Sequence, residues 1–476
     1  MLAGALPVLA FPAPSWWWLA WVGLVPLLLV VRGATTAFDG AVRAWLGMAG
    51  YVLATQYWLL PSAGPLLAAL AVVLGALWLP WGWAAYRLLS GSLTTRRMLA
   101  AVVVLPSAWV IAEAARSWER LGGAWAPLGA SQWTQPATMA SASLGGVWLT
   151  SFLIVGCNTA VVGAILLRSA RVVAAAIVIG FVTVGPAWFW FGPSPAPGTT
   201  IRIALAQPGK IEDATARQAA GEALTAELAG QRLDLVVWGE SSVGVDLTSH
   251  PEAMARLADL SRRVGADLLV NVDARAPAGG IHKSAVLIGP NGARGSYSKT
   301  RLVPFGEYVP LRPLLGWATR HTKAAAEDRR RGGGPVVLNT RSLAIGPLIS
   351  FEATFSDLPR REVQLGAELL AYQSSTSTYQ GSWAQPQLAS MVAVHAVEVG
   401  HPAVHAGLSG VSSAFDAHGR KLAWFPATNH GVIVVDVPLG SRTTVYQRIG
   451  DWVLALAFSI VVCAGVLAGL REWCAR

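Results

Sequence analysis

The sequence predicts an integral membrane bundle of about eight α-helical spans, with a layered α/β domain inserted before the last span. Only 13% of the 476 residues are charged, against about 25% in a typical soluble domain. The deficit is uneven, because residues 1–193 carry 12 charged side chains and residues 194–476 carry 50. These numbers exclude a single large soluble enzyme, and they also exclude a transporter built only of membrane spans.

Apolar runs mark the predicted spans. They lie at residues 2–11, 16–31, 44–60, 64–89, 98–115, 141–167, 172–192 and 452–470. Most of them approach the roughly 20 residues that cross the hydrocarbon core as a helix. The first run is short, and we expect it to form half of a hairpin that turns at Pro12 and Pro14. It has neither a basic segment before it nor a small-residue cleavage site, so we do not expect a cleaved signal peptide.

The distribution of arginine predicts the orientation. With the N-terminus in the cytoplasm, the predicted cytoplasmic loops and tail contain nine arginines, whereas the short outer loops contain only Arg116 and Arg120. Positive charge is enriched on the cytoplasmic side of membrane proteins. We therefore expect a multi-pass protein of the cell membrane, with both termini cytoplasmic and the α/β domain on the extracytoplasmic side. Much of the net charge of +10 thus reflects topology and not nucleic-acid binding.

The predicted domains are residues 1–193 with seven spans, residues 194–450 as the extracytoplasmic domain, and residues 451–476 as the last span and tail. In the middle domain, short β-rich runs alternate with amphipathic helical stretches, which is typical of a layered α/β fold. We expect mobile loops at 329–334, within the charged stretch 321–334, and at 373–382. Strands are expected at 201–207, 233–238, 266–272, 284–290, 336–340, 343–350, 368–373, 402–407, 411–417 and 431–437, and helices near 212–230, 251–264 and 384–399.

Three polar residues follow predicted strands of this domain, namely Glu240, Lys299 and Ser350. Functional residues of open α/β sheets gather at the carboxyl ends of strands. A glutamate as general base, a lysine that stabilises an oxyanion and a hydroxyl that attacks a carbonyl group together indicate covalent acyl chemistry. Lys299 stands out because the chain has 5 lysines and 31 arginines, so a retained lysine suggests a role that needs a compact charge.

Other kinds of site are disfavoured. Residues 194–450 contain no cysteine, which excludes a disulfide framework, a CxxC zinc site and a thiol nucleophile there. No GxSxG elbow surrounds Ser350 or Ser409, which argues against a lipase-type triad. We expect His395, His401 and His405 to provide surface or pocket polarity and not metal ligands. We predict no metal and no cofactor.

Four segments carry a resemblance to a known family. They are FPAPSWWWLAWVGLVPLL near the start, VVWGE, SKTRLVPFGEYVPL and PLISFEATF. Together with the spans, they resemble the apolipoprotein N-acyltransferases of the nitrilase, or carbon–nitrogen hydrolase, superfamily, over essentially the whole chain. The resemblance implies a nitrilase-like αββα sandwich. It implies that Glu240 is the general base, Lys299 the catalytic lysine and Glu307 a second essential glutamate.

The chain departs from the family at the nucleophile. The family sequence Cys-Tyr-Glu is replaced by Ser350, Phe351 and Glu352. Nearby, Gly239 replaces a proline, histidines replace arginines at 395 and 401, and Ser409 replaces an asparagine. A hydroxyl depends on its base far more than a thiol does, and a carboxylate is a weak base toward a hydroxyl. Ser350 therefore permits acyl transfer at a handicap.

The resemblance implies an enzyme that takes an acyl chain from a phospholipid and passes it, through an acyl-enzyme, to the N-terminal amine of a diacylglyceryl-cysteine lipoprotein. The implied partners are a phospholipid donor, a diacylated lipoprotein acceptor and membrane lipid, without nucleic acid. Retention of the glutamates and of Lys299 favours this interpretation. Loss of the family cysteine, tyrosine and arginines favours an alternative, a weak or inactive homologue that binds lipid or lipoprotein.

Another role for an inactive homologue is to scaffold a membrane glycosyltransferase. Some actinobacterial members of the family are fused to, or partner with, a polyprenyl-phosphate mannose synthase, which suggests that enzyme as the partner. A third interpretation is an extracytoplasmic amidase of the wider superfamily. The PFGEYVP segment and the eight predicted spans argue against the amidase.

Overall fold

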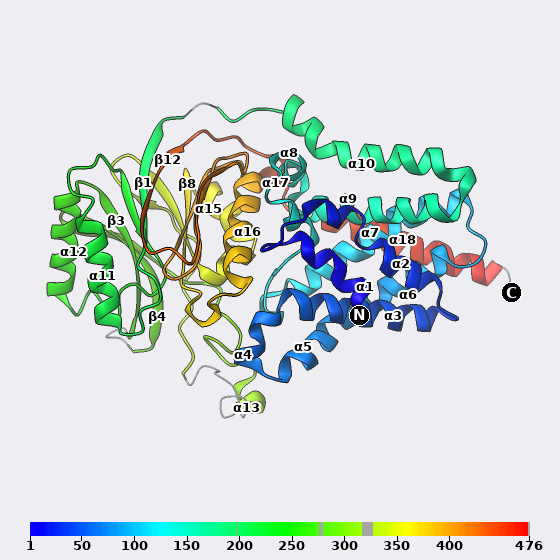
Figure 1. Cartoon of the computed structure of the whole chain (residues 1–476), viewed down its shortest axis with the longest axis horizontal. Helices are drawn as coiled ribbons and strands as arrows, with labels where there is room; N and C mark the ends of the chain where they lie inside the picture. The colour runs from blue at the N-terminus through cyan, green and yellow to red at the C-terminus, as the bar shows by residue number, and fades with distance from the viewer. Residues whose placement is uncertain (197, 276–278, 317–326, 475–476) are drawn as a thin grey trace. The chain divides into compact units, whose positions relative to one another are not determined.

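A computed structural model describes residues 1–196, 198–275, 279–316 and 327–474. The chain folds as two compact units. The first comprises Met1–Gly192 and Arg448–Arg476, and the second comprises Pro193–Gln447. Figure 1 labels the helices and strands of both units.

The first unit is α-helical. Within the described residues, five helical segments are long and apolar enough to cross a membrane, judged by length and composition: Leu66–Leu89, Thr95–Arg116, Ala142–Leu166, Arg168–Phe191 and Trp452–Leu470. Its α-helices are α1 (Leu2–Ala5), α2 (Val25–Arg32), α3 (Ala37–Thr55), α4 (Leu60–Ala63), α5 (Leu66–Gly75), α6 (Leu79–Leu89), α7 (Thr95–Arg116), α8 (Pro136–Met139), α9 (Ala142–Leu166), α10 (Arg171–Phe191) and α18 (Trp452–Cys474).

Two of the eight predicted runs form short helices joined to 3-10 turns, and a third corresponds to a long helix with charged residues in its first half. The run at 2–11 is α1 followed by a 3-10 turn over Leu6–Ala10, and the run at 16–31 is a 3-10 turn over Trp17–Trp21 followed by α2. The third run overlaps α3, whose first half carries Asp39 and Arg43. The predicted helical bundle is confirmed, whereas the number of eight spans stays a prediction.

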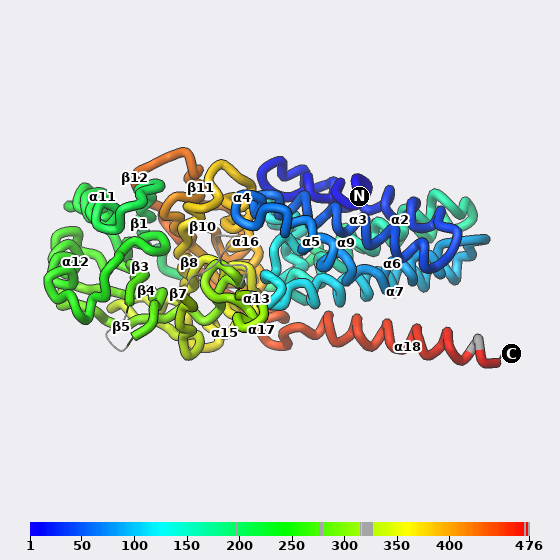
Figure 2. The backbone as a smooth tube through the Cα atoms, turned by 90° about the horizontal axis from the view of Figure 1, so that it is seen from below, coloured from blue at the N-terminus to red at the C-terminus, as the bar shows by residue number. Residues whose placement is uncertain are grey.

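Small residues let the helices of this unit pack closely. A Cβ atom added at Gly82 in α6 would lie 2.3 Å from Cβ of Ala44 in α3, so the two backbones approach as small residues allow in membrane bundles. The last helix, α18, runs beside α7 (Figure 2). Near its start, the indole of Trp452 donates a hydrogen bond to the Leu144 carbonyl over 2.8 Å.

The second unit contains two six-stranded mixed sheets. One has the strand order β12-β1-β2-β3-β4-β5 and the other β11-β10-β9-β8-β7-β6. Three parallel strands form the centre of each sheet, β1-β2-β3 in one and β7-β8-β9 in the other. The strands are β1 (Thr200–Gln207), β2 (Leu235–Trp238), β3 (Asp267–Arg275), β4 (Ile281–Gly289), β5 (Gly292–Ser298), β6 (Leu338–Asn339), β7 (Ala344–Ile349), β8 (Leu369–Ser374), β9 (Ala403–Gly407), β10 (Ser412–Phe415), β11 (Lys421–Phe425) and β12 (Gly431–Pro438).

The two sheets pack face to face and helices cover both outer faces (Figure 1). Ile203 and Val237 of one sheet meet Ile345 and Val404 of the other in a single buried cluster. A second cluster lies between the first sheet and its helices, α11 (Ala214–Ala226) and α12 (Pro251–Val264). The other sheet packs against α15 (Asp357–Gln364) and α16 (Ala384–Val399). This arrangement confirms the predicted αββα sandwich.

Sequence reasoning missed two elements of the sandwich, β11 and α15, whereas the strand that it placed before Lys299 is β5. The expected loop at 373–382 is shorter, because β8 extends to Ser374 and a 3-10 turn follows at Ser377–Tyr379. Residues 321–326 of the charged stretch lie outside the described residues. Residues 329–334 form a loop, in which Arg330 and Gly332 donate backbone hydrogen bonds to Ile281 and Lys299. The mobility of this loop stays a prediction.

Candidate active site

The three predicted residues lie at strand ends, and the fold brings them into contact. Glu240 follows β2, Lys299 follows β5, and Ser350 begins a 3-10 turn (Ser350–Thr354) directly after β7. Lys299 Nζ lies 3.4 Å from Glu240 Oε1, and the Ser350 side chain lies close enough to the Glu240 carboxylate to help lower its pKa. Glu240 and Lys299 are buried, with 4% and 1% of their surfaces exposed.

Glu307 completes the charge arrangement that the sequence predicts. Its Oε1 lies 2.9 Å from Lys299 Nζ, and its Oε2 accepts a hydrogen bond from the Val303 backbone over 2.8 Å. Lys299 is therefore closer to Glu307 than to Glu240. The second glutamate holds the lysine in place and leaves Glu240 within reach of the Ser350 hydroxyl.

Sequence reasoning missed a second lysine, Lys283, in the middle of β4. Its Nζ lies 2.7 Å from Glu240 Oε1, 3.4 Å from Glu307 Oε1 and 3.6 Å from Asp273 Oδ2. Asp273 in turn contacts Arg329 at 3.2 Å. The rarity of lysine in this chain was a usable signal, because Lys283 is one of only five.

The ionic surroundings hold Glu240 as a carboxylate. Burial acts to raise its pKa, but the charges of Lys283 and Lys299, with hydrogen bonds from Lys283 and Ser350, outweigh burial and lower the pKa to about 2. Burial also acts on Glu307, and the same two lysines lower its pKa. Both glutamates therefore carry charge at neutral pH, and Glu240 is ready to accept a proton, although as a weak base.

The turn that begins at Ser350 has an unusual backbone. Ser350 has a φ of +53°, a left-handed conformation that a residue with a side chain rarely adopts and that costs about 1–2 kcal/mol. Such backbone strain concentrates at functional sites. Phe351, the next residue, is buried and packs edge-to-face on Phe355, with the ring centroids 5.0 Å apart.

Glu352 fastens this turn to the segment that carries Lys299. Oε2 accepts a hydrogen bond from the Ile349 backbone over 2.8 Å. Oε1 accepts from the Thr300 and Arg301 backbones over 2.7 and 3.0 Å, and from the Tyr297 hydroxyl over 2.7 Å. Glu352 is thus a positioning residue that fixes Ser350 relative to Lys299.

The carboxyl end of β8 supplies the last contacts of Glu240. The Ser375 backbone donates to Glu240 Oε2 over 3.2 Å, and the Glu240 backbone donates to the Ser374 carbonyl over 3.1 Å. Nearby, the amide of Gln373 donates to the Trp238 carbonyl over 2.9 Å. These bonds join the second sheet to the segment of the first sheet that ends in Glu240.

The structure contradicts part of what we expect of the histidines. His395 and His405 are buried, so neither provides surface polarity, and a contribution to pocket polarity stays a prediction. His395 contacts Glu398 Oε2 and the Ala353 carbonyl, each at 2.8 Å. Burial lowers the pKa of His405 to about 4. Among the described residues, no group of three or more His, Cys, Asp or Glu side chains is arranged to hold a metal ion.

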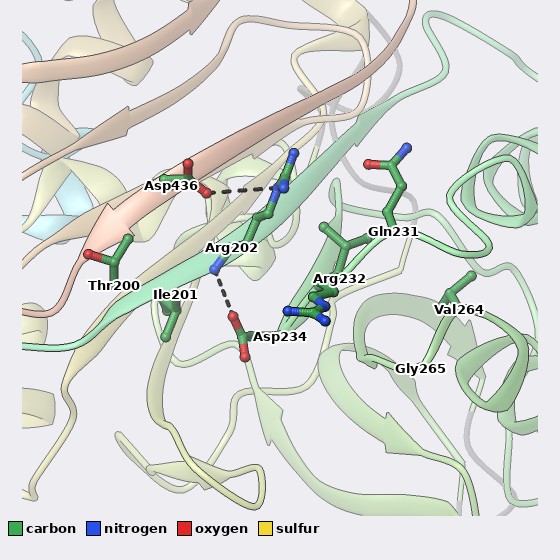
Figure 3. Close-up of a pocket in the computed structure, with 10 residues that line it drawn as sticks. Thr200, Ile201, Arg202, Gln231, Arg232, Asp234, Val264, Gly265 and Asp436 are labelled. Carbon is green, nitrogen blue, oxygen red and sulfur yellow. Dashed lines mark hydrogen bonds and ion pairs between the residues drawn. The ribbon is translucent and has the colours of Figure 1, made fainter.

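A pocket of about 510 Å³ lies elsewhere on the sandwich (Figure 3). It is lined by the first residues of β1 and by Asp234 and Asp436, and Arg202 contacts both aspartates. Because β1 and β2 are parallel, this pocket is at their amino ends, whereas Glu240 follows the carboxyl end of β2. The pocket is therefore separate from the candidate active-site residues.

Comparison with known proteins covers both units. Residues 3–160 match the apolipoprotein N-acyltransferase N-terminal domain, and residues 202–447 match the carbon–nitrogen hydrolase family. The chain is 29% identical to an apolipoprotein N-acyltransferase of Geobacter metallireducens, over 99% of this chain and 94% of that protein. It is 26% identical to the protein of the same name from Pseudomonas syringae pv. tomato, over 98% of this chain and 96% of the other.

Among solved structures, a carbon–nitrogen hydrolase from Helicobacter pylori G27 is similar to 51% of this chain and to 90% of its own length, with 15% identity and a TM-score of 0.41.

Proposed function

Because the chain belongs to the carbon–nitrogen hydrolase family and carries an apolipoprotein N-acyltransferase N-terminal domain, we propose that it N-acylates lipoproteins in the membrane. The donor is a phospholipid, and the acceptor is the N-terminal amine of a diacylglyceryl-cysteine lipoprotein. One observation carries the proposal: Glu240, a buried carboxylate beside the Ser350 side chain, lies within 3.4 Å of two lysines.

The first half-reaction forms an acyl-serine. Ser350 Oγ attacks the ester carbonyl carbon of the phospholipid while its proton moves to Glu240, and the carbonyl oxygen becomes an oxyanion that Lys299 stabilises. The tetrahedral intermediate then breaks the bond to the leaving alcohol. The lysophospholipid leaves with the proton from Glu240, so that the carboxylate is restored.

The second half-reaction transfers the acyl chain. The free amine of the acceptor attacks the acyl-serine carbonyl carbon, and Glu240 takes a proton from the amine. The bond between the carbonyl carbon and Ser350 Oγ breaks, and Oγ receives the proton from Glu240. One C–O bond is exchanged for one C–N bond, and the enzyme returns to its starting state.

The proposal is tested by mass spectrometry of a lipoprotein N-terminal peptide, in a host that lacks its own N-acyltransferase. We expect a third acyl chain with the wild-type protein and its absence with Ser350→Ala. Ser342, which is exposed in a turn before β7, supplies a matched control, because Ser342→Ala is expected to behave as wild type. Only diacylated peptide with wild type, despite confirmed expression in the membrane, would contradict the proposal.

The alternative is a homologue that binds lipid or lipoprotein without catalysis. Glu240 favours it, because a carboxylate whose pKa is lowered to about 2 is a weak base toward a hydroxyl. Ser350→Cys separates the two functions, since a thiol needs less help from its base. A third acyl chain with Ser350→Cys but not with wild type would indicate an otherwise competent site that serine disables. Neither the site nor the similar proteins named above support a polyprenyl-phosphate mannose synthase as a partner.

A further inference from the structure

Lys283 is the positively charged group nearest to the proposed base. Its Nζ lies 2.7 Å from Glu240 Oε1, whereas Lys299 Nζ lies 3.4 Å from the same oxygen. The side chain projects from the middle of β4, where the strand register pairs Lys283 with Asp273 of β3. It is 12% exposed, against 1% for the Lys299 side chain. Of the two lysines, Lys283 is thus the more open to an incoming substrate.

The charges around these lysines balance. Three carboxylates and three cations are linked by contacts of 3.6 Å or less, namely Glu240, Glu307 and Asp273 with Lys283, Lys299 and Arg329. The other groups that face Glu240 are uncharged, namely the Ser350 hydroxyl and the Ser375 backbone N–H. A buried charge persists only when it is paired, so removal of one lysine leaves this set with an excess of negative charge.

We propose that Lys283 is a second catalytic lysine, which holds Glu240 ionised and stabilises the negative charge that leaves Glu240 when Ser350 attacks. The inference rests on the proposed function for the role of Ser350 as nucleophile. As the proton moves from Ser350 to Glu240, the negative charge moves to the substrate carbonyl oxygen. Lys283 then loses its charged partner at 2.7 Å and attracts the oxyanion, as preorganised charges in enzyme sites do.

Charge stabilisation by a second lysine is more useful to a serine nucleophile than to a cysteine nucleophile. A hydroxyl gives up its proton far less readily than a thiol, so the transition state carries more charge that needs stabilisation. One lysine is already bound to Glu307 at 2.9 Å. Lys283 supplies a second positive charge without a second base.

The test measures the reactivity of Ser350 directly, without phospholipid or lipoprotein. A fluorophosphonate phosphonylates an activated serine hydroxyl with loss of fluoride, and peptide mass spectrometry quantifies the product at Ser350 in the purified full chain. We expect Lys283→Met to lower the plateau labelling rate about 10²–10³-fold. In a plot of labelling rate against pH, we also expect the rise at low pH to shift to a higher pH by about 1–3 units. The reason is that Glu240 loses its nearest cation, so its pKa rises. Lys283→Arg should restore part of the rate.

Lys210→Met is the matched control, because Lys210 is an exposed lysine of the same domain paired with Glu212. Thermal unfolding of each variant shows whether it has folded. Lys283→Gln is a second neutral substitution, which keeps a hydrogen-bond donor at this position in case Lys283→Met does not fold. A folded Lys283→Met or Lys283→Gln variant with the wild-type rate and pH profile would overturn the inference, as would a wild-type Ser350 that is never labelled. Labelling with the expected shift but no lipoprotein acylation would leave the inference standing and contradict the proposed function alone.

Discussion

Ser350 stands at the centre of the site, and its reactivity depends on how exactly the neighbouring backbone is held. A left-handed residue after a strand projects its side chain away from the sheet, as nucleophile turns of other α/β enzymes do. The φ of +53° at Ser350 is unfavourable by itself. The hydrogen bonds of Glu352 compensate for it, since one carboxylate accepts from Ile349 on one side and from Thr300, Arg301 and Tyr297 on the other.

Replacement of Glu352 by glutamine tests this positioning role. Glutamine has the same shape, but its NH₂ group cannot accept the hydrogen bonds that one of the two oxygens accepts. We expect the free energy of unfolding to fall by about 1.5–3 kcal/mol, and fluorophosphonate labelling of Ser350 to fall with it. Differential scanning calorimetry and the labelling assay provide the measurements.

Glu368→Gln is the control for that substitution, because the Glu368 carboxylate is exposed and accepts a single backbone hydrogen bond from Ala344. Equal stability and equal labelling in wild type and Glu352→Gln would contradict the positioning role.

At the residue scale, the sequence predicts much of the site. Glu240, Lys299 and Ser350 each end a strand, and the strand-end rule locates all three. Lys283 is different, because it lies inside β4 and the rule does not apply to it. Its role depends on the pairing of β3 with β4, which brings it beside Asp273, and strand pairing is not visible in a single sequence. His395 and His405 are not at the surface, because their polar side chains find partners inside the fold.

At the scale of elements, helix α15 carries a buried carboxyl group without a partner. Glu362 is fully buried, and neither of its oxygens has a hydrogen-bond partner among the described residues. Its carboxyl group packs against Gly346 of β7, where an added Cβ atom would lie 2.5 Å from Oε2. Burial and the nearby charge of Glu352 raise the pKa of Glu362 well above its ordinary value of 4.5. Folding therefore favours the protonated form of Glu362.

Glu362→Gln should stabilise the protein in a pH-dependent way. Above pH 4.5 the unfolded chain loses the Glu362 proton while the folded chain keeps it, so folding costs about 1.4 kcal/mol more for each pH unit until the folded pKa is reached. Glutamine does not titrate, so the Glu362→Gln variant avoids this pH-dependent cost. The difference in Tm between Glu362→Gln and wild type should therefore grow from pH 5 to pH 7.

Thermal unfolding of the full chain at several pH values measures the effect. Glu368→Gln serves again as the control, because its exposed carboxyl group should give a difference that does not grow with pH. A gain for Glu362→Gln that is absent or constant between pH 5 and pH 7 would show that Glu362 is not held protonated.

The failure to predict α15 has a physical cause. The α15 segment DLPRREVQ is eight residues long and contains a proline, which suggests a turn. By contrast, α12 and α16 follow their predicted ranges closely, because each has 14 or more residues and length makes a periodic pattern distinct.

At the scale of the whole molecule, the predicted orientation across the membrane can be measured. The arginine pattern predicts that residues 194–450 face the extracytoplasmic side, where a lipoprotein acceptor and outer-leaflet phospholipid are found. Single cysteines at two exposed serines test it, in a variant without Cys157, Cys463 and Cys474. We expect an impermeant maleimide to label Ser342→Cys in intact cells and Ser92→Cys only after permeabilisation. The reverse pattern would contradict the orientation.

The measurement that tests the central claim most directly is the mass of the Ser350 peptide after the purified full chain has been incubated with a phospholipid of defined acyl chains and no acceptor. We predict an added acyl group on Ser350 that is lost when an acceptor with a free diacylglyceryl-cysteine amine is supplied, and that never forms in Ser350→Ala. A Ser350 peptide that stays unmodified, in a preparation that nonetheless acylates the acceptor, would contradict the acyl-serine mechanism.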